Sequence, residues 1–310
     1  MKSYTVAITI RSFNDSGQAI DLLRRFFTIS YINESGKRLN ETELIKALDG
    51  ADAVIAGTEV FSANVLTKSP QLKVISRVGV GIDSIDHLVS KSRGIQIFNT
   101  PDAPVQAVAE HTLALILSIL KQISRYNENA RIGEHSIYAG NLLSGKTIGV
   151  IGLGRIGFRV ASLLSAFGCD ITYYDPFVKA AHSIDWERKD TLNELLRNAD
   201  IITLHTNSTN DQAPLMDLEA FDTCKRGAVL INTARGSCID EEALYEALII
   251  GTIAGAGLDV AVNEPLTGPL LDLPQVIVTP HVASNTYETR AQMELEAVNN
   301  LIEWQKEQIL

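Results

Sequence analysis

The stretch KTIGVIGLGRIG, residues 146–157, combines an apolar run with a glycine motif. Gly152, Gly154 and Gly157 supply the spacing GxGxxG, and the helix-like run RIGFRVASLLSAFG follows at once. In such a strand–turn–helix unit the first glycine permits a tight turn, the second lets the backbone approach a pyrophosphate, and the third lets helix and strand pack closely. The N-terminus of the helix then faces the phosphate charge. The stretch therefore predicts a dinucleotide-binding unit.

An acidic residue stands at the position that this type of unit uses to bind ribose. Asp175 ends the next strand-like run, ITYYD, 23 residues beyond Gly152. A carboxylate at this strand end accepts hydrogen bonds from ribose hydroxyls and repels a 2′-phosphate, which favours NAD over NADP. The alternative is that Asp175 is only a turn residue before Pro176.

Outward from the glycine motif, strand-like apolar runs alternate with helix-like segments. This alternation is typical of parallel strands with helical crossovers, so we predict an α/β protein with doubly wound parallel sheets. The runs form two series, and 310 residues exceed what one hydrophobic core usually organises, so we expect two domains. The first series is YTVAITI (4–10), TISY (28–31), AVIAG (53–57), LKVIS (72–76) and IQIF (95–98). The second is KTIGVIG (146–152), CDITYYD (169–175), ADIITLH (199–205), GAVLINT (227–233), IAGAGLDV (253–260) and QVIVTP (275–280).

Three further segments complete the predicted organisation. The apolar stretch 109–120 predicts a buried helix between the two series. The polar run 124–145 predicts an excursion of the kind used in subunit contacts or lids. The apolar spacing in 285–308 predicts a long final helix that packs back on the first domain.

Composition narrows the class of partner. The chain has 45% apolar and 21% charged residues and a formal net charge of -10, which argues against nucleic acid or an anionic membrane surface as the main partner. No apolar run reaches the roughly 18 residues of a membrane span, and the N-terminal run shows no signal-peptide cleavage pattern. The three cysteines show no metal-binding spacing, so we expect reduced thiols, no metal site and a cytoplasmic protein with a small-molecule substrate.

Three polar residues directly follow apolar runs of the second series, where open α/β sheets collect their ligands. Arg235 follows AVLINTA, Glu264 follows GLDVAVN, and His281 follows VIVTP. Each also has an ordinary structural interpretation, as a solvated charge, a turn residue or a histidine with local partners. Together they form a chemical set, because a histidine moves a proton near neutral pH, a carboxylate orients it, and a guanidinium binds a carboxylate. Hydride transfer between NAD and a 2-hydroxy acid needs these services, since the cofactor carries the hydride.

With these motifs the sequence resembles the D-isomer-specific 2-hydroxyacid dehydrogenases, in particular their phosphoglycerate dehydrogenase-like members. The motifs SRVGVGIDSID, FNTPDAPVQAVAEHTLAL, TIGVIGLGRIG, INTARG, LDVAVNEPL and TPHVAS occur in the family's order over nearly the whole chain. The resemblance implies a Rossmann NAD-binding domain, residues 101–284, inserted in a discontinuous flavodoxin-like substrate-binding domain, residues 1–100 and 285–310. It also implies a homodimer formed through the NAD-binding domain.

The resemblance also implies roles for individual residues. Arg235 is expected to bind the substrate, His281 to be the acid/base, and Glu264 to be its partner. The substrate carboxylate is expected in a backbone cradle formed by Val78, Gly79, Val80 and Gly81. The residues expected near the cofactor are Gly152, Gly154, Arg155, Ile156, Gly157, Asp175, His205, Thr206, Thr233 and Asp259. For Asp259 and His205, local structural roles remain alternatives, and His111 is assigned mostly to packing.

The substrate is less well defined than the chemistry. The resemblance favours 3-phosphoglycerate and 3-phosphohydroxypyruvate, and Arg11 and Arg77 are candidate phosphate partners, with surface arginines as the alternative interpretation. The loop at 205–215 lacks the proline-containing sequence usual in the family. Two enzyme alternatives are a glyoxylate/hydroxypyruvate reductase and a D-lactate-type dehydrogenase. An alternative from another class is an NAD-sensing, corepressor-like binding protein.

Overall fold

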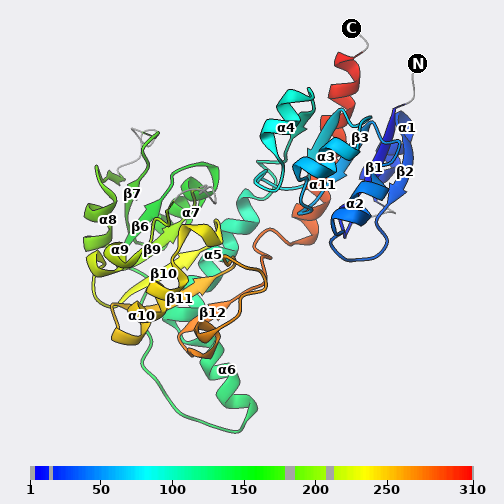
Figure 1. Cartoon of the computed structure of the whole chain (residues 1–310). Helices are drawn as coiled ribbons and strands as arrows, with labels where there is room; N and C mark the ends of the chain where they lie inside the picture. The colour runs from blue at the N-terminus through cyan, green and yellow to red at the C-terminus, as the bar shows by residue number, and fades with distance from the viewer. Residues whose placement is uncertain (1–3, 14–16, 179–185, 207–212, 309–310) are drawn as a thin grey trace. The chain divides into compact units, whose positions relative to one another are not determined.

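The computed structural model describes residues 4–13, 17–178, 186–206 and 213–308. The chain divides into two compact units. The first consists of Met1–Pro104 and Asn285–Leu310, and the second of Val105–Ser284. Each unit is built on its own parallel sheet (Figure 1).

The first unit contains a five-stranded parallel sheet in the order β2-β1-β3-β4-β5. Helices α1 and α11 share a core with one face of this sheet, and the residues of α2, α3 and α4 pack on the other. The final helix α11 contacts α1 and β4, so the C-terminal segment completes the unit that the N-terminal segment begins. The strands are β1 (Thr5–Ile8), β2 (Thr28–Ile32), β3 (Ala53–Ala56), β4 (Val74–Arg77) and β5 (Gln96–Phe98). The helices are α1 (Gln18–Phe26), α2 (Glu41–Ala47), α3 (Ala63–Lys68), α4 (His87–Ser92) and α11 (Tyr287–Glu307).

The second unit contains a seven-stranded parallel sheet in the order β12-β11-β10-β9-β6-β7-β8. Helices α5 and α7 pack on one face, and α8, α9 and α10 on the other. The strand order reverses between β9 and β6, and such a switch point opens a crevice at the carboxyl ends of the strands. The strands are β6 (Thr147–Ile151), β7 (Asp170–Tyr174), β8 (Glu187–Arg188), β9 (Ile201–Leu204), β10 (Ala228–Asn232), β11 (Ile253–Leu258) and β12 (Val276–Val278). The helices are α5 (Val105–Leu120), α6 (Ile123–Arg131), α7 (Arg155–Ala166), α8 (Leu192–Asn198), α9 (Leu218–Thr223) and α10 (Glu241–Ile250).

Local sequence explains the ends of α10, which follows the Arg235 segment. The side chain of Asp240 accepts hydrogen bonds from the amides of Glu242 and Ala243, so it caps the helix N-terminus. Gly251 ends the helix with φ +75°, a conformation that glycine adopts without a steric penalty. Asp240 therefore fixes where α10 begins, and Gly251 fixes where it ends before β11.

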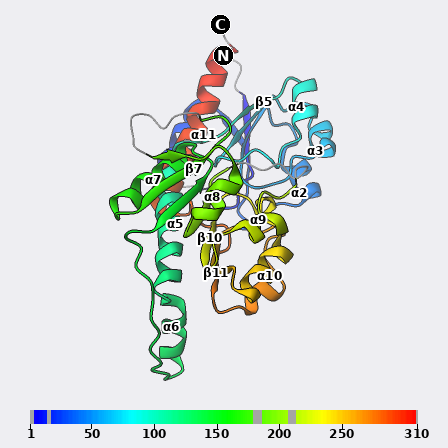
Figure 2. The ribbon, with the colours of Figure 1, turned by 90° about the vertical axis from the view of Figure 1, so that its left-hand side faces the viewer.

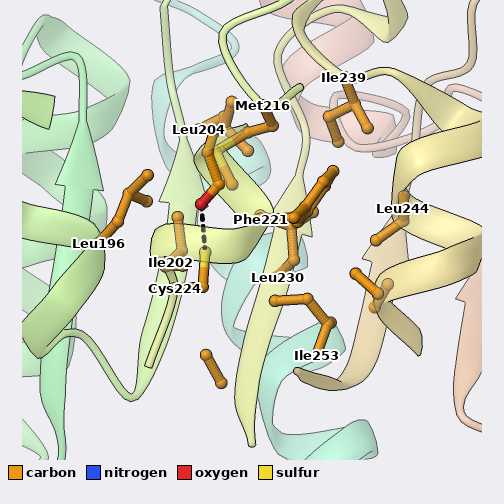
Figure 3. Packing of buried hydrophobic residues seen from close by; sticks show 14 of the residues in the cluster. Leu196, Ile202, Leu204, Met216, Phe221, Cys224, Leu230, Ile239, Leu244 and Ile253 are labelled. Carbon is orange, nitrogen blue, oxygen red and sulfur yellow. Dashed lines mark hydrogen bonds between the residues drawn. The ribbon is translucent and has the colours of Figure 1, made fainter. Parts of the chain in front are cut away.

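The core between the sheet and helices α8, α9 and α10 is apolar and closely packed (Figure 3). Phe221 lies at its centre with Leu230 and Leu244 nearby. Cys224 donates its Sγ–H to the carbonyl of Ala220, and burial raises the pKa of this thiol to about 12. All three cysteines are buried, so none is placed to act as a nucleophile.

The predicted α/β class with two doubly wound parallel sheets is confirmed. The buried helix predicted at 109–120 is α5, which begins earlier, at Val105, and packs against α7, β10 and β11. The excursion predicted at 124–145 contains α6, which extends away from the sheet of its unit in both views (Figures 1 and 2). In the described part of the chain no single helix is long and apolar enough to cross a membrane, and the pair that reaches that length together, α5 and α6, is bent by 64°.

Candidate functional site

The glycine loop, residues 152–157, joins β6 to α7 at the switch point of the seven-stranded sheet. Gly152 has φ +89°, and a Cβ added there would lie 2.6 Å from the carbonyl oxygen of His205. A Cβ on Gly157 would lie 2.0 Å from the carbonyl oxygen of Gly152. A Cβ on Gly154 would meet nothing within 4 Å among the described residues. The first and third glycines are therefore required by the fold, and the second leaves the backbone open to a pyrophosphate.

Two predicted cofactor residues begin the helix behind this loop. Arg155 is exposed and Ile156 is partly buried, and both lie in the first turn of α7. The first turn of α7 gives the loop the positive end of the helix dipole. The loop therefore fits the pyrophosphate of a dinucleotide in both shape and charge.

Asp175 lies at the end of β7 and is buried. One carboxylate oxygen accepts a hydrogen bond of 2.8 Å from the amide of Leu153 in the glycine loop. The other accepts from the amides of Phe177 and Val178, at 2.8 and 3.0 Å. Each oxygen has two lone pairs, so acceptor capacity remains for ribose hydroxyls. The carboxylate thus has a structural role that the sequence did not reveal, and it ties the glycine loop to the loop that follows β7.

His205 follows β9 directly beside the glycine loop. Its Nε2 lies 2.9 Å from the hydroxyl of Thr203, and its Nδ1 is shielded from solvent without a hydrogen-bond partner among the described residues. Burial lowers the pKa of His205 to about 3, so the ring is neutral at physiological pH. Thr206 is partly buried next to it, whereas residues 207–212 of the unusual loop lie outside the described residues.

Glu264 and His281 lie in contact although 17 residues separate them in sequence. Nδ1 of His281 lies 3.0 and 3.1 Å from the two carboxylate oxygens of Glu264. Since a carboxylate only accepts hydrogen bonds, Nδ1 carries the proton and Nε2 is left for another partner. Both side chains are accessible, with 42% of His281 and 44% of Glu264 exposed. The pair can therefore exchange a proton with a bound molecule.

The charges around Glu264 favour its ionised form. Partial burial acts to raise the pKa of this carboxyl, but the hydrogen bond and charge of His281, a backbone hydrogen bond at Ala261 and the charge of Arg235 together lower it below its ordinary value. Arg235 is thus close enough to act on Glu264. The structure brings together the three residues that the sequence singled out.

The Arg235 segment is held by its backbone. Asn232 is buried, its side-chain amide donates to the carbonyl of Arg235 at 2.8 Å, and its oxygen accepts from the amide of Ala234 at 3.0 Å. A Cβ on Gly236 would lie 1.9 Å from the carbonyl carbon of Ala261, so the chain leading to Glu264 packs directly on this glycine. Gly236 therefore sets the spacing between the Arg235 and Glu264 segments.

Asp259 fixes the His281 loop, which we define as residues 279–284 after β12. Its side chain is 1% exposed and accepts hydrogen bonds from the hydroxyl of Thr279 at 2.6 Å and from the amides of Val282 and Ala283, each at 2.9 Å. Its carbonyl accepts from the amide of His281 at 2.8 Å. These bonds hold His281 at φ +55°, in the left-handed region that residues with a Cβ rarely occupy. Asp259 therefore has a demonstrable structural role in this loop.

The segment expected to bind the substrate carboxylate follows β4 in the first unit. The amide of Val78 donates to Ala56 and the amide of Gly79 donates to the hydroxyl of Thr100, at 2.8 and 2.7 Å. The amides of Val78 and Gly79 therefore already have acceptors within the first unit, and the role of residues 78–81 as a substrate cradle stays a prediction. In the described structure the amides of Val80 and Gly81 form no hydrogen bond, and both residues are partly exposed. These two amides are the ones that can receive a carboxylate.

Arg77 lies beside this cradle. A Cβ on Gly79 would lie 1.5 Å from a terminal nitrogen of Arg77, so the guanidinium lies directly over that glycine. Gly79 has φ +129°, which only glycine adopts readily. Arg11, the other candidate phosphate partner, is exposed just after β1. The structure thus places Arg77, rather than Arg11, against the cradle.

Two residues on α5 escaped the sequence analysis of the site. Nε2 of His111 lies 3.0 Å from the hydroxyl of Thr279, and the hydroxyl of Thr112 lies 3.1 Å from that of Thr233. Thr233, an expected cofactor residue, is therefore joined to α5. The adjacent pair of a histidine and a threonine on an apolar helix was the available signal, but its partners lie more than 100 residues away in sequence.

Comparison with known families gives one match over more than half of the chain. Residues 113–283 match the family described as D-isomer specific 2-hydroxyacid dehydrogenase, NAD binding domain. The matched segment contains the glycine loop, Asp175, Arg235, Glu264 and His281.

Individual relatives extend the similarity to both units. The chain is 39% identical over 256 residues to the D-3-phosphoglycerate dehydrogenase of Mycobacterium leprae, which covers 81% of this chain and 48% of that protein. It is 36% identical to the hydroxypyruvate reductase of Thermotoga maritima, over 86% of this chain and 89% of that protein. The crystal structure of the TT0316 protein from Thermus thermophilus has a TM-score of 0.87 and 37% identity, with 96% of each chain covered. The chain spans about half the length of the phosphoglycerate dehydrogenases that it matches.

Proposed function

The chain belongs to the D-isomer specific 2-hydroxyacid dehydrogenase family, and from this premise we propose that it catalyses the reversible conversion of a 2-oxo acid and a D-2-hydroxy acid with NAD(H). The observation that carries this proposal is the contact of 3.0 Å between Nδ1 of His281 and Glu264, with the charge of Arg235 acting on the same carboxylate. The family membership supplies the reaction class, and this contact supplies a proton donor of the right chemistry.

In the proposed mechanism the fork of Arg235 binds the substrate carboxylate. Nε2 of protonated His281 donates its proton to the carbonyl oxygen at C2 during reduction and takes it back during oxidation. Ionised Glu264 orients the ring through Nδ1 and stabilises its positive charge. When bound, NADH supplies the hydride that adds to C2.

The cofactor residues are proposed in the second unit and the substrate cradle in the first. We assign the pyrophosphate to the open backbone at Gly154 and the first turn of α7, and the ribose hydroxyls to Asp175. Neutral His205 and Thr206 border the same loop. Thr233 and Asp259 are assigned to the nicotinamide end, where Asp259 also anchors the His281 loop.

For the substrate we propose 3-phosphohydroxypyruvate, paired with 3-phosphoglycerate. The identity of 39% to phosphoglycerate dehydrogenases supports this choice, and so does the guanidinium of Arg77 over Gly79, since a phosphate needs a cationic partner near the cradle. Hydroxypyruvate is the second candidate, because the hydroxypyruvate reductase of Thermotoga maritima matches over 89% of its own length.

The experiment is a panel of NADH oxidation assays. Purified protein is mixed with NADH and, separately, 3-phosphohydroxypyruvate, hydroxypyruvate, glyoxylate or pyruvate, and kcat/KM is compared. We expect the highest kcat/KM with the phosphorylated acid and its selective loss in Arg77→Ala. A preference for hydroxypyruvate in the wild type would instead select the second candidate. NADH binding without turnover on any acid would contradict the enzyme assignment and favour the NAD-sensing alternative.

We also propose a homodimer formed through the second unit, acting in the cytoplasm. The segment that contains α6 and the following loop extends from the sheet and exposes apolar side chains, with Ile132 77%, Ile137 92% and Leu142 72% exposed (Figure 2). Exposed apolar groups of this kind are typical of protein–protein contacts. Light scattering on the wild type and on the Ile137→Asp variant tests this proposal, and a wild-type monomer would contradict it.

A further inference from the structure

His111 lies on α5, far from the strand ends in sequence, yet it contacts the His281 loop. Its Nε2 lies 3.0 Å from the hydroxyl oxygen of Thr279 and 3.5 Å from Oδ1 of Asp259. The histidine side chain is 22% exposed and the aspartate 1% exposed. A polar cluster this well shielded from water has a defined pattern of donors and acceptors.

The position of each proton in this cluster follows from the partners. The hydroxyl of Thr279 has one proton, and it lies 2.6 Å from Oδ1 of Asp259, which can only accept. The hydroxyl oxygen is therefore the acceptor toward His111, so Nε2 of His111 carries a proton and donates it. His111 thus fixes the orientation of the Thr279 hydroxyl, and that hydroxyl is directed at Asp259.

Asp259 connects the Thr279 hydroxyl to the backbone of the His281 loop. Its carboxylate accepts hydrogen bonds from the Thr279 hydroxyl and from the amides of Val282 and Ala283, and its main-chain carbonyl accepts from the amide of His281. The left-handed backbone of His281 is sterically unfavourable for a residue with a Cβ. Several hydrogen bonds to one buried carboxylate offset this cost, and each requires the carboxylate to keep one orientation.

We propose that His111 is a positioning residue for His281: it holds the Thr279–Asp259 pair that fixes the left-handed backbone of the acid/base. The inference rests on the proposed function in so far as His281 moves the proton. Helix α5 is suited to this role because its buried residues pack against α7 and the sheet. Its Thr112, whose hydroxyl donates to the carbonyl of Val108, also accepts a hydrogen bond from the hydroxyl of Thr233. One rigid helix thus supports both the His281 loop and the strand end before Arg235.

The kinetic test compares three variants on α5. His111→Leu removes the donor at similar volume, and we expect kcat to fall about threefold to tenfold, the equivalent of one hydrogen bond. KM for the 2-oxo acid is expected to stay within about twofold, since the substrate carboxylate is assigned to Arg235 and not to the residues that His111 holds. His111→Gln, which restores an N–H donor, is expected to recover part of kcat. Glu110→Gln changes the neighbouring exposed residue and serves as the matched control.

Two spectroscopic measurements test the inference without turnover. In the wild type, nitrogen NMR of the His111 ring is expected to show a proton on Nε2. Amide hydrogen exchange at His281, Val282 and Ala283 is expected to be faster in His111→Leu than in Glu110→Gln. A ring with no proton on Nε2, or unchanged exchange together with unchanged kcat, would overturn the inference. A wild type that reduces no 2-oxo acid but shows the expected exchange pattern would overturn the proposed function and leave the structural link standing.

Discussion

The glycine loop and the His281 loop lie at the carboxyl edge of one sheet, but their conformations have different physical origins. The glycine loop depends on side chains that are missing, since a Cβ on Gly152 or Gly157 would lie within 2.6 Å of a backbone oxygen. The His281 loop depends on side chains that are present, and its supports, Asp259 and His111, lie on other elements. The conformation of the glycine loop is encoded by a local sequence motif. The conformation of the His281 loop depends on side chains that only folding brings close to it.

The two kinds of support suit two different functions, cofactor binding and proton transfer. A backbone cradle suits the pyrophosphate, which every dinucleotide presents in the same form. A proton donor needs an exact direction toward one atom, and side-chain hydrogen bonds can fix that direction. Substitutions in the glycine loop should therefore affect mainly NADH binding, and substitutions in the His281 loop should affect mainly kcat.

The largest effect is expected from the side chain that the second loop presents. His281→Ala removes the proposed acid/base, and kcat for reduction is expected to fall about 10²- to 10⁴-fold. The Kd for NADH, measured by fluorescence titration, is expected to change little because the glycine loop is intact. His87→Ala, an exposed histidine on α4, is the control and should behave as the wild type. Wild-type turnover in His281→Ala would remove the histidine from the mechanism.

The converse effect is expected from the glycine loop. In Gly157→Ala the new Cβ would lie 2.0 Å from the carbonyl oxygen of Gly152, so the loop must shift and the free energy of unfolding is expected to fall by about 1–3 kcal/mol. NADH binding should be lost with it.

Gly154→Ala is the matched variant for this loop. Its Cβ meets nothing within 4 Å among the described residues, so we expect weaker NADH binding at unchanged stability. Denaturant unfolding and NADH titration of both variants separate the two effects. Equal stability of Gly157→Ala and the wild type would show that the loop tolerates a side chain at its helix-facing glycine.

Features that depend on a local motif could be predicted from the sequence. The alternation of strand and helix runs predicted the α/β class, and the GxGxxG motif identified the strand before the switch point, because both signals are local. Arg235, Glu264 and His281 were singled out because each follows an apolar run, and parallel strands bring their carboxyl ends to one edge. The contact between Glu264 and His281 and the effect of the Arg235 charge on Glu264 follow from that topology.

What escaped prediction depends on distant partners. The role of His111 arises from a contact with Thr279 across 168 residues, and no local pattern distinguishes it from a packed histidine on an apolar helix. The amide of Gly79 in the predicted cradle donates to the hydroxyl of Thr100 on the neighbouring segment, and no local pattern indicates this contact. The sequence of residues 78–81 predicts a cradle. Which of its amides can bind a substrate depends on the hydrogen-bond acceptors that neighbouring segments supply.

Asp175 combines features of both loops, because it lies in the cofactor region but fixes the backbone through side-chain hydrogen bonds. Asp175→Ala is expected to raise the Kd for NAD about tenfold to a hundredfold, the equivalent of a hydrogen bond to a charged group, and to raise the Kd for NADP much less. Stability should fall as well, because three amides lose their acceptor.

Asp175→Asn is the control for this stability loss, since it keeps an acceptor oxygen and removes the charge. Calorimetric titration with both dinucleotides, beside thermal unfolding, gives the two quantities separately. An equal loss of NAD and NADP affinity in Asp175→Ala would restrict the carboxylate to bracing the loop.

The smallest effect is expected in the pH dependence, where the electrostatics of the second loop can be tested without changing its shape. The surroundings lower the pKa of Glu264, so the carboxylate stays ionised at and above neutral pH and stabilises the protonated ring of His281. Glu264→Gln keeps an acceptor for Nδ1 but removes the charge. Reduction requires the protonated ring, so the alkaline limb of the kcat profile should move to lower pH. Stopped-flow reduction with saturating NADH between pH 5 and 10 measures this limb, and Glu110→Gln controls for the loss of a remote carboxylate. If the limb stays in place in Glu264→Gln, the contact of 3.0 Å orients the ring without stabilising its charge.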